Sequence, residues 1–133
     1  MKEENTYRQT IPSSTTGRYT ALTRKAMRIC YAAHEGQMDK SGVPYVFHPI
    51  HLAEQMETEE EICTALLHDV VEDTKWTLKE LEAEGFPTGV LEAVRLLTRE
   101  KDVPYMAYIE RLSGNQIARK VKLADLEHNS DLT

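Results

Sequence analysis

The sequence has few of the residues that are typical of disulfide-stabilised or β-rich proteins. Only two of its 133 residues are Cys, six are Gly, and aromatic residues make up 7%. Strands are enriched in aromatic side chains, so this composition favours a helical protein. Cys30 and Cys63 lie among apolar residues at helical spacing. They are therefore predicted to be reduced core residues rather than a disulfide.

Long hydrophobic runs and an excess of positive charge are also missing. No apolar run approaches the roughly 20 residues that cross a membrane. The charged residues 1–5 are not followed by an apolar segment, so we expect no signal peptide and a cytoplasmic protein. Acidic residues outnumber basic ones by 22 to 16, giving a net charge of −6. That balance argues against a nucleic-acid surface but leaves room for a small phosphorylated ligand. The sequence leaves the oligomeric state open.

Hydrophobic spacing predicts an all-α protein with one domain. Residues 1–19 are polar and turn-rich, which predicts a flexible N-terminal arm, and residues 20–133 are predicted to form the domain. The chain is long enough for a single core. Apolar residues three and four apart predict helices over residues 20–36, 49–56, 58–71, 77–85, 87–98, 104–112 and 116–129. Only residues 43–47 show a weak strand pattern.

Residues 66–74, with the sequence LLHDVVEDT, place ionisable groups inside an apolar helix. A buried charge needs a partner or a metal. On a continuous helix, His68 shares a face with Glu72. Asp69 likewise shares a face with Asp73. The adjacent pair His68 and Asp69 suits a divalent metal, and the pair Glu72 and Asp73 suits proton transfer from a metal-bound water. A lone buried His is more often a hydrogen-bonded core residue. The acidic pair one turn later favours the functional interpretation.

Further candidate ligands lie elsewhere in the chain. His48 precedes a helix started by Pro, and Asp125 lies near the end of an apolar helical face, with Asn129 one turn beyond. Two His and two Asp suit Mn²⁺, Fe²⁺ or Zn²⁺ better than Ca²⁺. The remaining histidines compete for these roles: His34 is expected in the core or at a cap, His51 on the surface, and His128 near Asp125 but outside the predicted set.

Several motifs follow one another in an order that identifies a family. They are AHEGQ at 33–37, KSGVPY at 40–45, FHP at 47–49, ALLHDVVEDT at 65–74, KLAD at 122–125 and HN at 128–129. Over residues 20–133 the chain resembles the HD-superfamily hydrolase domain of RelA/SpoT-type enzymes, which remove the 3′-pyrophosphate of (p)ppGpp. The resemblance implies a compact all-α HD-domain bundle that holds a single Mn²⁺.

The resemblance also implies roles for individual residues. His48, His68, Asp69 and Asp125 match the metal ligands, Glu72 and Asp73 the catalytic acidic pair, and Lys40, Ser41 and Asn129 the nucleotide contacts. At position 39 this chain has Asp, where the family usually has an Arg that stacks on guanine. The residues that follow Asp125 also differ from the family's pattern. An Asp cannot stack on a base as Arg does.

These residues together predict a metal-dependent phosphohydrolase that acts on (p)ppGpp. The alternatives are an HD-domain phosphatase for a different nucleotide and a non-catalytic nucleotide-binding module. The physiological substrate, the metal in the cell and the presence of helices beyond Thr133 stay open at this point.

Overall fold

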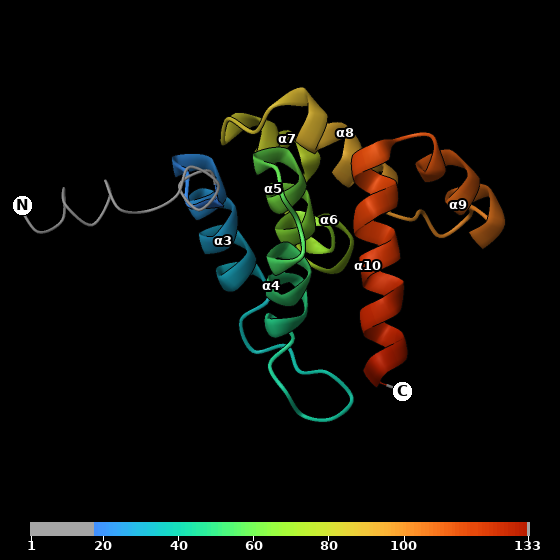
Figure 1. The fold of residues 1–133 in the computed structure, drawn as a ribbon, viewed down its shortest axis with the longest axis horizontal. Helices are drawn as coiled ribbons and strands as arrows, with labels where there is room; N and C mark the ends of the chain where they lie inside the picture. Colours follow the sequence, from blue (N-terminus) through green and yellow to red (C-terminus); the bar gives the residue numbers. More distant parts are fainter. Residues whose placement is uncertain (1–17, 133) are drawn as a thin grey trace, which may run out of the picture.

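The computed structural model describes residues 18–132, of which 130–132 are described by their backbone alone. The helices are α3 (Ala21–Ala33), α4 (Phe47–Glu54), α5 (Glu59–Leu67), α6 (Val70–Asp73), α7 (Leu78–Ala83), α8 (Thr88–Leu97), α9 (Tyr105–Ser113) and α10 (Gln116–Leu132) (Figure 1). Within these residues no strand forms, and residues 43–47 contribute only an isolated bridge between Met38 and Pro44. The predicted all-α fold is confirmed.

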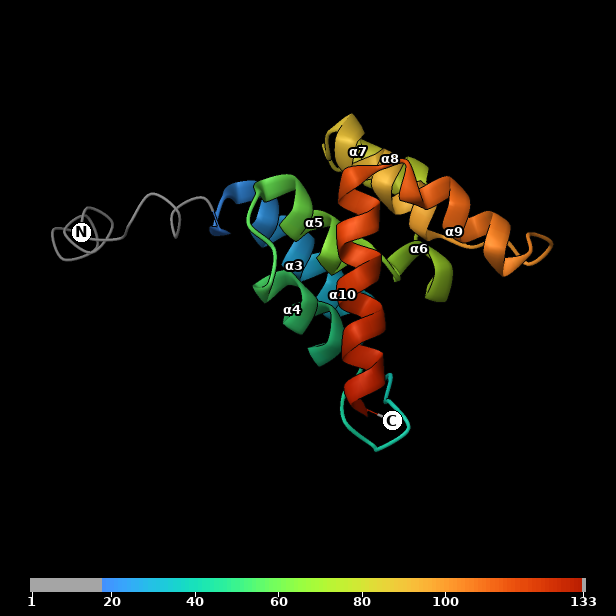
Figure 2. The same cartoon turned by 45° about the vertical axis from the view of Figure 1, so that its right-hand side comes forward.

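Helix α5 lies at the centre of the fold. It packs against α3, α4, α8 and α10, and α10 runs alongside α4 and α5 (Figures 1 and 2). Every residue of α5 from position 62 to position 67 is buried. A helix that is apolar on all sides is stable only when other elements surround it. His68 directly follows this buried end of α5, and its side chain is buried as well.

The sequence pattern predicts one helix over residues 58–71, and this prediction is wrong. The helix breaks after Leu67 and resumes at Val70. At the break Asp69 has φ −104° and ψ −2°, in the sparsely populated region between the helical and extended conformations. His68 and Asp69 therefore occupy a junction between two helices, not adjacent faces of one. The other predicted helices begin and end within a few residues of those observed.

Threonine capping boxes begin α5 and α7, as the sequence predicts. Thr58 accepts a hydrogen bond from the backbone N–H of Glu61, and the Glu61 carboxylate accepts one from Thr58. Thr77 and Glu80 repeat this arrangement at the start of α7. Each box satisfies amide groups that the first turn of a helix leaves without an intrahelical acceptor.

We expect Thr58→Ala to lower the free energy of unfolding by about 1 kcal/mol, because the first turn of α5 loses its side-chain acceptor. Urea denaturation of the wild type, Thr58→Ala and Thr58→Ser measures this effect. The Ser variant keeps the hydroxyl and serves as the matched control. A loss of equal size in both variants would show that the methyl group, not the cap, stabilises this end.

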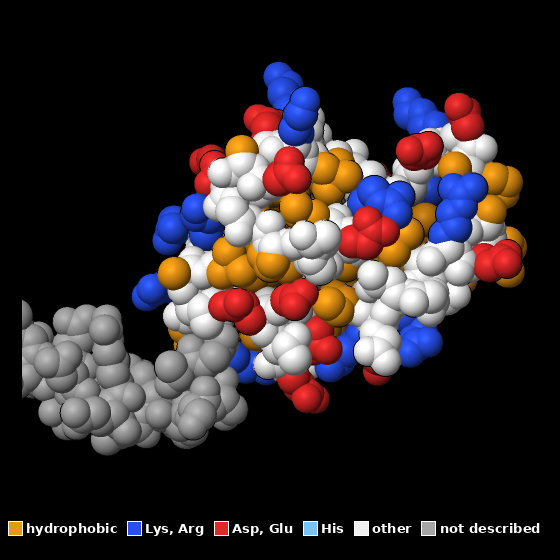
Figure 3. All heavy atoms as spheres, turned by 90° about the horizontal axis from the view of Figure 1, so that it is seen from above, with side chains coloured by type: hydrophobic (Ala, Val, Ile, Leu, Met, Phe, Trp, Pro, Cys, Tyr) orange, Lys and Arg blue, Asp and Glu red, His pale blue; other side chains and the backbone are white. Residues whose placement is uncertain are grey.

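Both cysteines are free and fully buried, as predicted. Burial raises the pKa of the Cys30 and Cys63 thiols to about 12, so both stay protonated at neutral pH. Among the described helices, none combines the length and apolar character that a membrane crossing needs. The face seen in Figure 3 carries acidic and basic side chains interspersed, rather than one continuous basic area.

Most of the predicted N-terminal arm, residues 1–17, lies outside the described residues. Arg18, near the end of the arm, is described. Its guanidinium donates to the backbone carbonyls of Ala53 at 3.3 Å, Glu54 at 3.3 Å and Met56 at 2.6 Å. This residue therefore attaches the start of the domain to the C-terminal end of α4.

Candidate metal centre

His68 presents one ring nitrogen to a cluster of carboxylates. Its side chain is buried, and Nδ1 donates to the carbonyl oxygen of Ala65 at 2.7 Å. Nε2 lies 3.0 Å from Oδ2 of Asp69 and 3.7 Å from Oδ1 of Asp125, yet it is aligned with neither for a hydrogen bond. A buried ring nitrogen without a hydrogen bond, facing two carboxylates, fits a metal ligand better than a core residue.

Helices α4 and α10 complete the cluster. His48 lies at the start of α4, and its Nε2 lies 2.7 Å from Oδ1 of Asp125 on α10. One potential ligand atom from each of His48, His68 and Asp125 lies within 4.8 Å of the others, and all three residues are buried. Two imidazole nitrogens with carboxylate oxygens are a common donor set for divalent transition metals. The residues present therefore fit a divalent ion.

The electrostatics of the cluster favour a cation. Burial lowers the pKa of His68, but the carboxylates of Asp69 and Asp125 outweigh it and raise this pKa to about 10. Burial acts to raise the pKa of Asp69, but His68 and a hydrogen bond from Tyr45 lower it to about 2. Burial likewise opposes ionisation of Asp125, yet a hydrogen bond from His48 and the nearby positive charges of His68 and Lys122 hold its pKa well below the usual range. Two ionised, poorly solvated carboxylates need a positive charge between them.

Tyr45 is a site residue that the sequence did not identify as one. Its hydroxyl donates a hydrogen bond to Oδ2 of Asp69. Burial and the negative charge of Asp69 raise the pKa of this phenol far above its usual value, so it remains a donor. It lies in the turn before α4, and its place in the KSGVPY motif, three residues before His48, was the available indication.

Glu72 and Asp73 lie on α6 beside the cluster. Oε1 of Glu72 accepts a hydrogen bond of 2.7 Å from the backbone N–H of Arg99, which fixes one carboxylate oxygen. Partial burial and the nearby charges of Asp69 and Asp73 raise the pKa of Glu72, although the Arg99 hydrogen bond opposes them. Partial burial and the charge of Asp69 also raise the pKa of Asp73. Carboxylates with raised pKa values exchange protons more readily near neutral pH.

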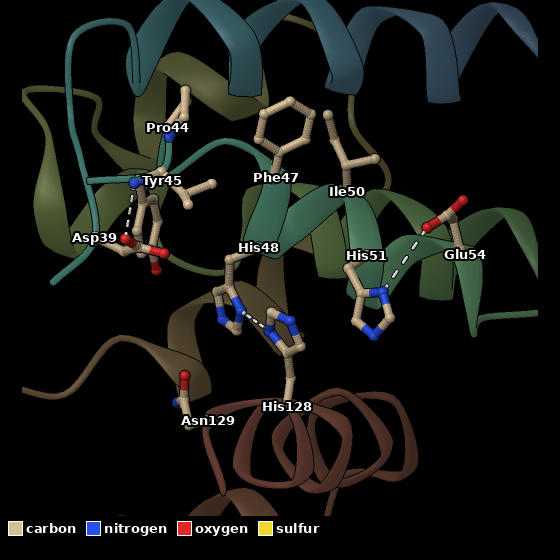
Figure 4. A pocket seen from close by; sticks show the side chains of 11 residues that line it. Asp39, Pro44, Tyr45, Phe47, His48, Ile50, His51, Glu54, His128 and Asn129 are labelled. Atoms are coloured by element: carbon tan, nitrogen blue, oxygen red, sulfur yellow. Dashed lines mark hydrogen bonds and ion pairs between the residues drawn. The ribbon is translucent and has the colours of Figure 1, made fainter. Parts of the chain in front are cut away.

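Two adjoining cavities open at the cluster. The inner cavity measures about 320 Å³ and is lined by Tyr45, His48, His68, Asp69, Glu72, Asp73, Leu97, Tyr108, Lys122, Asp125 and Asn129. The outer cavity measures about 530 Å³ and is lined by Asp39, Val43, Pro44, Tyr45, Phe47, His48, Ile50, His51, Glu54, His128 and Asn129 (Figure 4). Tyr45, His48 and Asn129 line both cavities. The inner one is polar and the outer one has a largely apolar wall.

The predicted nucleotide contacts occupy different positions relative to these cavities. Asn129 lines both, and its Nδ2 lies 3.4 Å from Oδ1 of Asp125. Lys40 and Ser41 are exposed in the loop before α4 and line neither cavity. Their role in binding stays a prediction. Lys122 lies closer, with Nζ 3.3 Å from Oδ2 of Asp125.

Asp39, which replaces the family's Arg, has a structural role in the loop. Its Oδ1 accepts hydrogen bonds from the backbone N–H groups of Ser41 at 2.8 Å and Val43 at 2.9 Å. Its own N–H donates to the carbonyl of Val43 at 2.8 Å. Short polar side chains commonly close turns in this way. The Asp39 carboxylate thus holds the loop that forms one wall of the outer cavity.

Comparisons with known proteins relate this chain to one family. Residues 26–127 match the model of a family described as HD domain. The guanosine-3′,5′-bis(diphosphate) 3′-pyrophosphohydrolase MESH1 of Danio rerio is 36% identical over 124 residues, which cover 83% of this chain and 68% of that protein. The bifunctional (p)ppGpp synthase/hydrolase SpoT of Escherichia coli K12 is 35% identical over 121 residues, covering 80% of this chain.

The chain spans only 16% and 17% of the length of the bacterial relatives from Haemophilus influenzae and Escherichia coli. Among solved structures, one described as a metazoan ortholog of SpoT that hydrolyzes ppGpp superposes with a TM-score of 0.68 at 28% identity. That match covers 80% of this chain and 67% of the other.

Proposed function

Because this chain belongs to the HD-domain family, we propose that it is a metal-dependent phosphohydrolase that removes the 3′-diphosphate of (p)ppGpp. The observation that carries the proposal is the convergence of His48, His68 and Asp125 in the wall of a polar cavity. The same cavity is lined by Glu72 and Asp73, a second pair of carboxylates on α6. Relatives named as (p)ppGpp pyrophosphohydrolases share the fold and the sequence pattern.

In this mechanism His48, His68, Asp69 and Asp125 would hold one divalent ion, which we propose to be Mn²⁺. When bound, such an ion makes a hydroxide available at neutral pH and polarises a phosphoryl oxygen. Glu72 and Asp73 orient the attacking water, accept its proton and return one to the leaving group. The backbone N–H of Arg99 keeps the Glu72 carboxylate in place for this work.

The two cavities divide the substrate between them. The diphosphate occupies the inner cavity, where Lys122 offsets part of its charge. The nucleoside occupies the outer cavity, whose volume of about 530 Å³ lies in the range of small-molecule sites and whose wall includes Phe47 and Ile50. Asn129 borders both cavities and is proposed to contact the sugar between them. Lys40 and Ser41 are proposed to contact the nucleotide from the loop.

A direct assay tests this function. Purified protein loaded with Mn²⁺ is incubated with ppGpp, and the products are separated by anion-exchange chromatography. We expect pyrophosphate and GDP in equal amounts. A panel of other nucleotide 3′- and 5′-phosphates is run in parallel. Metal-loaded protein that hydrolyses none of them, yet binds one, would instead support the non-catalytic nucleotide-binding module.

Asp39 favours one second candidate, an HD-domain phosphatase whose preferred nucleotide is not (p)ppGpp. A carboxylate on the wall of the outer cavity repels phosphate groups and supplies no stacking surface for guanine. In the same assay, a higher kcat/KM for another member of the panel would support this candidate over (p)ppGpp.

We expect Asp39→Asn to lower KM for ppGpp by about two- to fivefold, the effect of roughly 0.5 to 1 kcal/mol for one surface charge. Asn keeps an oxygen that can accept the loop's hydrogen bonds. Asp39→Arg adds a stacking group worth about 0.5 to 1 kcal/mol but removes both hydrogen bonds, each worth about 1 kcal/mol. Its KM is therefore expected to stay above that of Asp39→Asn. Steady-state kinetics with saturating Mn²⁺ measure the KM of both variants. A lower KM for Asp39→Arg than for Asp39→Asn would show that the loop tolerates the loss of the two hydrogen bonds.

A further inference from the structure

A hydrogen bond joins the rings of His48 and His128, which come from helices α4 and α10. Their Nδ1 atoms lie 2.5 Å apart, and the two side chains point toward each other in Figure 4. The ring planes differ by 15° and the centroids lie 4.8 Å apart. Stacked rings cannot approach closer than about 3.5 Å. The nitrogens therefore meet edge to edge, nearly in one plane, as in an N–H···N hydrogen bond.

A metal bound at Nε2 of His48 would fix where this residue carries its hydrogen. Two Nδ1 atoms that share a hydrogen bond hold one hydrogen between them. On the side of the candidate metal centre, Nε2 of His48 donates to Oδ1 of Asp125 at 2.7 Å, and a metal bound at Nε2 would displace this hydrogen. A histidine binds a metal only through an unprotonated nitrogen, so a ligating Nε2 requires the hydrogen on Nδ1. His128 is the acceptor that this arrangement needs.

We propose that His128 is a positioning residue, which accepts the hydrogen that Nδ1 of His48 carries when its Nε2 binds a divalent metal. The inference rests on the metal site of the proposed function and adds a residue that the predicted ligand set leaves out. His68 has an equivalent support, because its Nδ1 donates to the carbonyl of Ala65 at 2.7 Å. His51 packs against the His128 ring with centroids 4.4 Å apart.

The position of His128 on α10 gives the proposal its structural basis. Helix α10 supplies Asp125 to the metal centre and, three residues later, the acceptor for His48. One helix thus fixes both the carboxylate and the imidazole on this side of the site. A shift of α10 would misplace the two together.

Isothermal titration calorimetry with Mn²⁺ and Zn²⁺, without nucleotide, tests the role of His128. We expect His128→Ala to weaken metal binding about 10- to 100-fold, as the loss of an orienting partner usually does. His128→Asn places a carbonyl oxygen near the position of Nδ1 and is expected to recover most of that loss. Glu127→Gln changes the exposed neighbour of His128 on α10 but not the acceptor, and its metal affinity is expected to equal that of the wild type.

A spectroscopic measurement separates positioning from a general structural effect. Long-range ¹H–¹⁵N spectra of the Zn²⁺-loaded wild type are expected to show His48 protonated at Nδ1, and His128→Ala is expected to lose this fixed tautomer. Equal metal affinity in the wild type and His128→Ala would overturn the proposal, and so would a proton on Nε2 of His48. Equal losses of metal affinity in His128→Ala and His128→Asn would also overturn it.

The outcomes for His128 and for the proposed function are distinguishable. Wild-type protein that binds metal but hydrolyses no nucleotide would overturn the function and leave the role of His128 standing. Unchanged metal affinity in His128→Ala, with normal hydrolysis, would overturn only the positioning role. Wild-type protein that binds no metal would overturn both.

Discussion

Asp125→Asn is expected to lose both divalent metal and hydrolytic activity. The substitution keeps the size of the side chain but removes the negative charge that faces His48, His68 and Lys122. Loss of an orienting partner alone typically costs 10- to 100-fold in metal affinity, so removing a ligand should cost at least about 100-fold. Hydrolysis should fall with occupancy, because the nucleophile depends on the ion.

Metal content and calorimetry measure this loss. Glu127→Gln is the matched control, since it neutralises an exposed carboxylate on the same helix, outside both cavities. It is expected to retain metal and activity. His68→Ala should behave as Asp125→Asn does, and chelation of the wild type should abolish activity until Mn²⁺ is restored. Wild-type protein that binds none of Mn²⁺, Fe²⁺, Co²⁺ and Zn²⁺ would contradict the metal centre itself.

The double variant Glu72→Gln with Asp73→Asn is expected to keep its metal and fold while kcat falls about 10²- to 10⁴-fold, the usual contribution of general acid–base catalysis. Gln can still accept the hydrogen bond from the backbone of Arg99, so the side chain at position 72 should stay in place. What the variant loses is the capacity to accept and return a proton.

Single-turnover rates with saturating Mn²⁺, together with metal affinity and thermal melting, separate these effects. Glu82→Gln neutralises an exposed carboxylate on α7 and should leave all three measurements unchanged. Hydrolysis by the double variant at the wild-type rate would refute the proton-transfer role. A parallel loss of metal would instead place one of the two carboxylates among the ligands.

The sequence predicted an ionisable His-Asp pair inside an apolar segment, but not the backbone geometry that brings the two side chains together. Helical periodicity continues through residues 58–71 without Gly or Pro, so it predicted an unbroken helix. The observed break at His68 brings Nε2 of His68 to 3.0 Å from Oδ2 of Asp69. The position of this break depends on tertiary packing around α5. Intrinsic helix propensity is a weak guide to helix ends where tertiary packing determines them.

Side-chain contacts between segments that are distant in the sequence could not be predicted either. Tyr45 reaches Asp69, and His128 reaches His48 across 80 positions of sequence. Neither pairing follows from helical spacing within one segment. Asp39 is different, because an Asp before Lys-Ser-Gly is typical of a turn closed by its own side chain. Its structural role in the loop could therefore have been predicted from the local sequence.

The candidate ligands come from three places that are far apart in the chain: the start of α4, the junction between α5 and α6, and α10. An ion held among them acts as a reversible cross-link that the unfolded chain lacks. By mass action it adds about 2.7 kcal/mol to the stability of the folded chain when the free ion is at 100 times its dissociation constant. Protection of α10 from proteases and from hydrogen exchange should therefore rise with ion concentration, and cellular metal supply would set the lifetime of the domain as well as its rate.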